Sequence, residues 1–195
     1  FSKKGLIYRM SKLLPSTHTE NEGGKKEKAK KIETAFDMVW EGANANAELI
    51  VENKASGYYS YGNSKSPYAI VANGYQKLSY KNIYPGIDVE YTIPEKGGIK
   101  YTFIIHPGAD ASNIKMNYSS EGMLRINQKG DLEISSNGFS ILDHAPVTYI
   151  EENKKPVNSS FLLAGNTVSF QLGNYDNTKT VILDPWTINP GFTTT

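Results

Sequence analysis

Apolar and polar residues alternate in short runs along most of this chain, and turn residues separate the runs. In residues 32–40, for example, Phe36 and Trp40 fall on one face of an extended segment, whereas Asp37 falls on the other. A period of two is typical of a β-strand that is buried on one side. Further strands are predicted at residues 5–14, 48–52, 75–80, 87–93, 99–105, 114–118, 123–126, 132–134, 139–142, 147–150, 159–163, 168–172 and 180–183.

No segment sustains the 3.6-residue period of a helix, and Gly, Pro and Asn mark turns between the predicted strands. We therefore predict an all-β fold in which antiparallel, β-sandwich-like sheets are joined by long loops and contain little helix. An aromatic residue at a strand end, such as Trp40, can also lie half exposed. The expected core includes Phe36, Met38, Trp40, Ile87, Val89, Tyr101, Phe103 and Ile105.

The composition narrows the function classes. With 195 residues, of which 38% are hydrophobic, the chain can bury a large core, and its net charge of +1 gives no overall field for nucleic acid or an anionic membrane. The absence of cysteine excludes disulfides and thiolate catalysis. No run approaches the roughly 20 apolar residues of a transmembrane helix. Because no phosphate-binding loop, nucleophile elbow or dinucleotide fingerprint occurs, we expect no cofactor.

Three regions are expected along the chain. Residues 1–31 would hold a first strand and a charged, mobile loop, since residues 25–31 are rich in Lys and poor in apolar side chains. A basic ligand-binding patch is the alternative for that run, but it contains no interleaved aromatic residues. Residues 32–186 would form the all-β domain. Residues 187–195 read as an exit linker, and we expect a fragment of a longer protein with a following domain.

Three short motifs in the middle and at the end of the chain carry a family resemblance. Residues 80–91 read YKNIYPGIDVEY, residues 106–110 read HPGAD, and residues 181–186 read VILDPW. In this order they resemble an uncharacterised all-β domain family found upstream of seven-bladed-propeller-type (SBBP) repeats in large secreted proteins of Bacteroidota-type bacteria. The signature residues are Tyr84, Pro85, Gly86, Ile87, Asp88, Pro107, Gly108, Ala109, Asp110, Asp184, Pro185 and Trp186.

This resemblance implies a cellular context more than a chemistry. It implies export to the cell surface or medium, as cargo of type IX secretion, in an adhesin or a gliding-motility protein. The implied partners are downstream repeat or propeller domains of the same chain, secretion components or other surface proteins. The resemblance supplies no catalytic residue.

The motifs also have a direct structural interpretation. In each Pro-Gly pair the proline presets φ and the glycine accepts a positive φ, which predicts a type II turn before a strand. Asp110 is expected to cap the backbone that follows it. Both motifs are therefore interpreted as structural.

Few residues offer catalytic or metal-binding alternatives. Asp88 and Glu90 share one strand face and could serve glycoside hydrolysis, but we interpret them as a solvated edge or surface pair, or as partners of a nearby Lys. A calcium site using Asp88, Asp110 or Asp143 is possible in principle, although no loop has the spacing of a calcium motif. Finally, zinc is not expected, because the histidines lie far apart in sequence, at His18, His106 and His144.

Tyrosines gather in one turn-rich segment of low charge, which is the clearest candidate for a binding surface. They could form a stacking platform for a sugar or a partner protein, or simply cover sheet edges. We expect a non-catalytic structural or interaction module. The alternative is a carbohydrate- or matrix-binding module that uses Tyr58, Tyr59 and Tyr61. The full cluster comprises Tyr58, Tyr59, Tyr61, Tyr68 and Tyr75.

Overall fold

The computed structural model describes residues 2–14, 31–62, 70–94, 99–119 and 122–188. Within them the chain forms fourteen β-strands and one 3-10 helix, η1, so the all-β prediction is confirmed. The elements are β1 (Gly5–Leu13), β2 (Lys31–Trp40), β3 (Glu48–Tyr61), β4 (Ile70–Tyr84), β5 (Ile87–Thr92), β6 (Ile99–Ile105), η1 (Ala111–Asn113), β7 (Met116–Tyr118), β8 (Met123–Ile126), β9 (Leu132–Ser136), β10 (Phe139–Ile150), β11 (Pro156–Val157), β12 (Ser159–Ala164), β13 (Thr167–Leu172) and β14 (Val181–Ile188).

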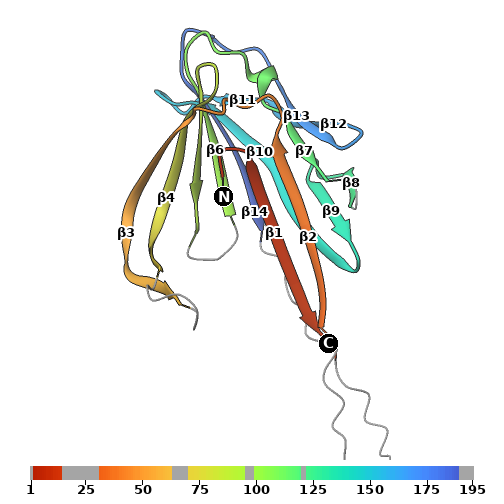
Figure 1. Ribbon diagram of the computed structural model, residues 1–195. Coiled ribbons are helices and arrows are strands. Elements are labelled where there is room, and N and C mark those ends of the chain that lie inside the picture. Colours follow the sequence, from red (N-terminus) through yellow and green to blue (C-terminus); the bar gives the residue numbers. More distant parts are fainter. Residues whose placement is uncertain (1, 15–30, 63–69, 95–98, 120–121, 189–195) are drawn as a thin grey trace, which may run out of the picture.

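Two antiparallel sheets make up the fold (Figure 1). The five-stranded sheet has the order β1-β2-β7-β13-β12. The nine-stranded sheet runs β3-β4-β5-β6-β14-β10-β9-β8, with β11 added beside β10. Apolar side chains from the facing sides of the two sheets form one core, as expected of a sandwich. No helix of the described residues is long and apolar enough to cross a membrane.

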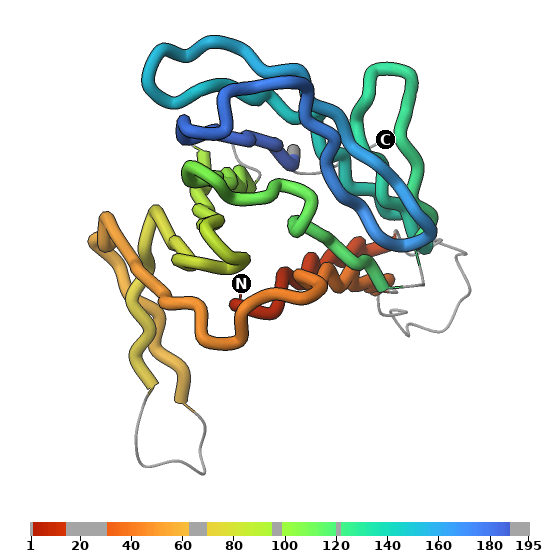
Figure 2. The backbone as a smooth tube through the Cα atoms, turned by 90° about the horizontal axis from the view of Figure 1, so that it is seen from above, coloured from red at the N-terminus to blue at the C-terminus, as the bar shows by residue number. Residues whose placement is uncertain are grey.

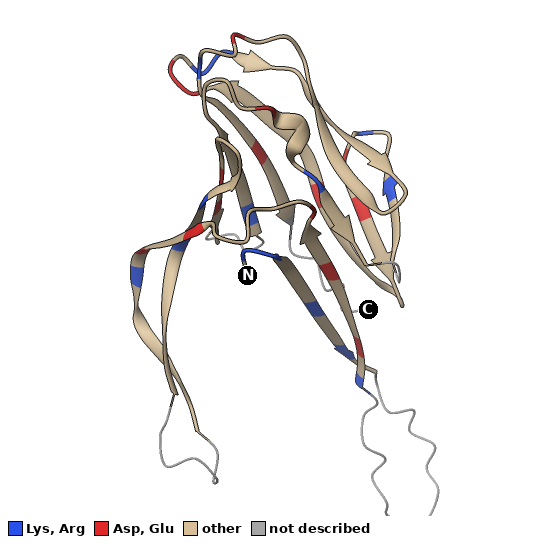
Figure 3. Ribbon diagram, turned by 45° about the horizontal axis from the view of Figure 1, so that its top comes forward, with Lys and Arg blue, Asp and Glu red and all other residues tan. Residues whose placement is uncertain are grey.

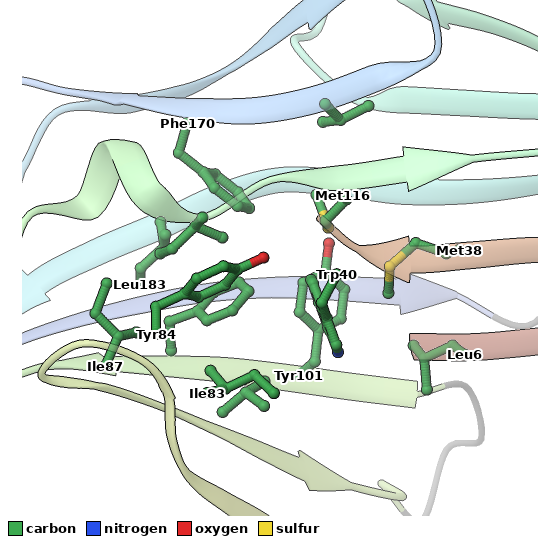
Figure 4. Packing of buried hydrophobic residues seen from close by; sticks show 14 of the residues in the cluster. Leu6, Met38, Trp40, Ile83, Tyr84, Ile87, Tyr101, Met116, Phe170 and Leu183 are labelled. Atoms are coloured by element: carbon green, nitrogen blue, oxygen red, sulfur yellow. The ribbon is translucent and has the colours of Figure 1, made fainter. Parts of the chain in front are cut away.

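The core is the part of the fold that the alternation predicts best. All eight expected core residues are at most 3% exposed. Trp40 is fully inside because its ring packs edge-on against Phe103, with 5.5 Å between centroids, and its Nε1 donates to Tyr91 Oη at 3.0 Å. Figure 4 shows Trp40 and Tyr101 lying together between the sheets. The possibility of a half-exposed Trp40 is therefore wrong.

Strands β3 and β4 run further than the pattern predicts. Expected strands at residues 48–52 and 75–80 become a single long hairpin, with a register shift between Lys54 and Tyr58. The outer half of this hairpin is exposed on both faces, so its sequence does not alternate between apolar and polar residues. Cross-strand hydrogen bonds, which residue type does not encode, extend the strands there.

Both expected domain boundaries fall inside paired strands. The first strand, β1, pairs with β2 from Gly5 opposite Val39 to Leu13 opposite Lys31, so it belongs to the same sheet as the rest. At the other end β14 continues beyond Trp186 to Ile188, and Thr187 is buried. The expected mobile run lies outside the described residues except for Lys31, which begins β2.

Candidate interaction surface and signature cluster

The two Pro-Gly turns of the signature lie against each other. Gly86 and Gly108 have φ angles of 69° and 79°, which only glycine adopts without strain and which agree with the predicted turns. The His106 N–H, next to the second turn, donates to Gly86 O at 3.0 Å. A Cβ placed on Gly86 would come within 3.0 Å of the Ala109 Cβ. Motifs that are separate in sequence are therefore one packed feature.

Tyr84 connects this feature to the end of β2. Its ring is buried, and its hydroxyl group lies 3.0 Å from Lys115 O and 3.2 Å from Glu41 O. Burial raises the pKa of Tyr84 to about 12, so the hydroxyl stays protonated and remains a donor. The side chain ties three segments together rather than facing a ligand.

Asp88 is not the solvated surface residue that its spacing from Glu90 suggests. It is 4% exposed, because β5 lies inside the nine-stranded sheet between β4 and β6. Its carboxylate accepts from the Asn82 N–H at 2.8 Å and Lys81 Nζ at 2.9 Å, and His106 Nε2 lies 3.0 Å away. Burial alone would raise the pKa of Asp88, but these partners outweigh it and hold the pKa below its ordinary value.

Glu90 lies two residues further along β5 and is also ion-paired. Lys77 Nζ lies 2.9 Å from its carboxylate, and Ser79 Oγ donates to it at 3.2 Å. Each member of the suspected catalytic pair is thus held by its own cation on β4. This arrangement favours a structural interpretation of both carboxylates.

The remaining signature residues bind neighbouring backbone and strands. Asp110 Oδ1 accepts from the Ser112 N–H at 2.9 Å and caps η1, which confirms the predicted cap. Asp184 accepts from Lys100 Nζ and Thr102 Oγ1, both at 2.7 Å, on the adjacent strand β6. Pro185 is buried, and the ring of Trp186 lies 6.1 Å from that of His144. None of these contacts leaves a side chain arranged around an open site.

The tyrosine cluster lies on the outer half of the β3–β4 hairpin. Tyr58, Tyr59 and Tyr61 are 67%, 66% and 60% exposed, Tyr75 is 39% exposed, and Tyr68 lies outside the described residues. Figures 1 and 2 show this hairpin projecting away from the rest of the molecule. We call residues 55–61 and 70–76 the hairpin arm.

The hairpin arm is uncharged on both faces and rich in tyrosine. The paired positions Tyr59–Ala72 and Tyr61–Ile70 share one face, where the two tyrosine rings stack with centroids 6.5 Å apart. The other face carries Tyr58 and Val71. No Lys, Arg, Asp, Glu or His occurs in the arm, and the outer part of this hairpin carries neither charge colour in Figure 3.

The carboxylate of Asp143, which the sequence suggested only as a possible calcium ligand, forms a buried polar centre in the core. Asp143 accepts from the Tyr101 hydroxyl and, at 3.1 Å, from Thr187 Oγ1. Burial raises the pKa of Asp143 to about 7, although both hydrogen bonds act in the opposite direction. The sequence signal for its burial was its spacing from Ile141, because side chains two positions apart in a strand lie on the same face.

The acidic residues considered for calcium are not brought together. Asp88 lies within β5, Asp110 caps η1 and Asp143 lies in the core. In the described part of the chain no group of three His, Cys, Asp or Glu side chains could hold a metal ion. Of the histidines, His106 contacts Asp88, His144 lies 3.3 Å from Asp131, and His18 is outside the described residues.

Comparison with known proteins returns one family. The family model described as "Domain of unknown function (DUF7948)" matches residues 1–186. No curated protein and no solved structure matches the chain significantly.

Proposed function

The chain belongs to this family of unknown function, and on that premise we propose that it is a non-catalytic interaction module of a large secreted or cell-surface bacterial protein. The observation that carries the proposal is the hairpin arm. Aromatic and aliphatic side chains at this level of exposure are costly in water and are enriched at protein interfaces. A contiguous exposed patch of this kind is typical of an interaction site.

The signature residues support the non-catalytic part of the proposal. Tyr84, Asp88, Asp110 and Asp184 each contact backbone or side chains of neighbouring segments. These contacts explain the motifs structurally, because they hold turns and strands in place. The proposed role is therefore to present a surface on a stable sandwich.

Export and the identity of the neighbours rest on the motif resemblance. We propose that the module is type IX secretion cargo, in an adhesin or gliding-associated protein. Repeat or propeller domains of the same protein, secretion components and other surface proteins are its proposed partners. Nucleic acid is not among them, because the net charge is only +1.

Protease accessibility on intact cells tests this proposal. The native protein would be followed by an antibody to the domain, before and after proteinase K treatment of whole cells, with a periplasmic protein as control. Loss of the signal while the periplasmic control survives is expected. Protection equal to that of the control would contradict a surface location.

A parallel assay tests the absence of catalysis. The purified 195-residue chain would be incubated with a panel of glycosides, esters and peptides, alongside an Asp88→Asn, Glu90→Gln double variant. We expect no turnover in either protein. Turnover by the wild type that disappears in the variant would restore the enzyme hypothesis.

Carbohydrate or matrix binding is the second candidate, and one observation favours it. The stacked rings of Tyr59 and Tyr61 present an aromatic platform to solvent. Pull-down on insoluble polysaccharides would detect this binding, with Tyr59→Ser, Tyr61→Ser as the test variant. Leu162→Ser, at an exposed apolar position outside the arm, is the matched control.

A further inference from the structure

The outer strand of the hairpin arm is a free sheet edge. β3 is the first strand of the nine-stranded sheet, and among the described strands it pairs only with β4. Along Tyr58–Tyr61, the N–H and C=O groups on its other side therefore have no ladder partner there. Such an edge is a template for pairing with another strand.

Only the outer part of β3 is suited to such pairing. Asn53 has a φ of 56°, and the register shifts between Lys54 and Tyr58, so the edge is irregular in the middle of the strand. The inner part also carries the exposed carboxylates of Glu48 and Glu52. Bulges and charges of this kind protect an edge from pairing, whereas Tyr58–Tyr61 has neither.

The chemistry of the arm selects among possible occupants. A charged partner would form no ion pair with it, because the arm has no ionisable group other than tyrosine. A glycan would use the tyrosine rings but would leave Ile70 and Val71, which are 70% and 57% exposed, without apolar contacts. Aliphatic and aromatic side chains without charge match the centre of a protein interface.

A second copy of the chain satisfies these conditions. In a two-fold interface a surface patch meets a second copy of itself, so a patch of one charge sign repels itself and an uncharged patch does not. A two-fold axis perpendicular to the sheet and midway between the two copies of Ser60 would set Tyr59 opposite the partner's Tyr61. The two stacked ring pairs would then meet on one face of a continuous sheet.

We infer that two copies of the chain associate antiparallel along Tyr58–Tyr61 to form a symmetric dimer joined through the hairpin arms. This inference rests on the proposed interaction function and names its partner. The dimer buries apolar side chains of both arms and completes the backbone hydrogen bonds of two free edges. Because no charge takes part, salt should not weaken its affinity.

Analytical ultracentrifugation of the 195-residue chain tests the inference. The wild type is expected to form a concentration-dependent dimer whose dissociation constant is no larger in 1 M than in 0.1 M NaCl. Tyr59→Lys, Tyr61→Lys should raise that constant at least tenfold, because four ammonium groups would meet at the interface. Val147→Lys, at an exposed position outside the arm, is the control and should leave it unchanged.

A cysteine variant locates the contact independently. The chain has no cysteine, so Ser60→Cys introduces one thiol, opposite its own copy in the proposed register. Directly opposed strand residues have the Cα spacing that a disulfide needs, and oxidation should give a covalent dimer. The exposed Ser11→Cys is the control.

Either of two results would overturn the inference. One is a wild type that stays monomeric at every concentration. The other is a dimer that resists the double Lys substitution and is not linked through Cys at position 60. Neither result bears on surface location or on the absence of catalysis, so the proposed function would remain open to its own tests.

Discussion

His106 Nε2 lies 3.0 Å from Asp88 Oδ2, which joins the two Pro-Gly motifs through side chains as well as through backbone. Asp88 is buried, whereas the His106 ring is half exposed at the end of β6. Eighteen positions separate the two residues in sequence. Their contact makes the two Pro-Gly motifs a single structural unit whose stability can be measured.

Removing the charge of Asp88 should destabilise the fold. Asp88→Asn keeps the side-chain shape but deprives Lys81 and His106 of their anion, at a cost of about 1–3 kcal/mol. Chemical denaturation at pH 7 measures the change. Asp37→Asn, on an exposed position of β2, should have almost no effect. Equal stability of the two variants would contradict the role given to Asp88.

The same residue sets a pH dependence in acid. The pKa of Asp88 in the folded chain is below its ordinary value, so the unfolded chain binds the proton more readily. The stabilisation is present above the unfolded pKa of about 4 and is lost as the pH falls through the folded pKa. The wild type and Asp88→Asn should therefore converge in stability toward pH 2, as thermal unfolding would show.

Asp143 should act in the opposite direction. Its folded pKa of about 7 is above the unfolded value of about 4, so the folded chain holds the proton more tightly. Its contribution to stability is complete below pH 4 and falls as the pH rises to about 7. Asp143→Asn stays neutral, and Tyr101 and Thr187 can donate to it as before.

The difference in unfolding free energy between Asp143→Asn and the wild type isolates this effect. As the pH rises from 4 to 8, the variant should become more stable relative to the wild type, by about 4 kcal/mol at most. Titrating groups that do not interact with Asp143 contribute equally in both proteins and cancel in this difference. A difference that does not change with pH would show that Asp143 stays ionised in the core.

Gly86→Ala tests the contact between the turns. The new Cβ would come within 3.0 Å of Ala109 and would also meet the positive φ of 69°. Gly138→Ala is the matched control, since Gly138 has a φ of 78° but open space around it. Both variants bear the backbone cost of about 1–2 kcal/mol, and the first should lose about 1 kcal/mol more. Equal melting temperatures of Gly86→Ala and Gly138→Ala would mean that Ala109 moves aside without loss of stability.

Tyr84→Phe tests the link between β4 and the backbone of Glu41 and Lys115. The substitution keeps the buried ring and removes only the hydroxyl group, leaving both carbonyl groups without this donor. A loss of about 1–2 kcal/mol is expected in urea unfolding. Tyr58→Phe, on the exposed arm, should change stability by less than about 0.5 kcal/mol. Indistinguishable urea midpoints of Tyr84→Phe and the wild type would contradict this link between Tyr84 and the two backbone segments.

The alternation of residue types determined the fold class, most strand positions and the core. Phe36, Met38 and Trp40 are buried as their spacing predicts, because side chains of a strand alternate between core and solvent whatever strand lies beside it. The Pro-Gly turns could also be predicted from the sequence. Proline restricts φ and glycine permits a positive φ, and both effects are local. Such features depend on a few consecutive residues.

Only the tertiary structure decided which residues from distant segments meet, and which strands lie inside a sheet. Asp88 is buried because β5 lies between β4 and β6, and nothing in its own segment encodes that place. Asp143 meets Tyr101 and Thr187 only when β10, β14 and β6 are neighbours. The tyrosines were visible in the sequence, but their exposure follows from a hairpin that extends beyond the opposite sheet. Strand order depends on the summed packing of the whole chain, so it cannot be derived from any one segment.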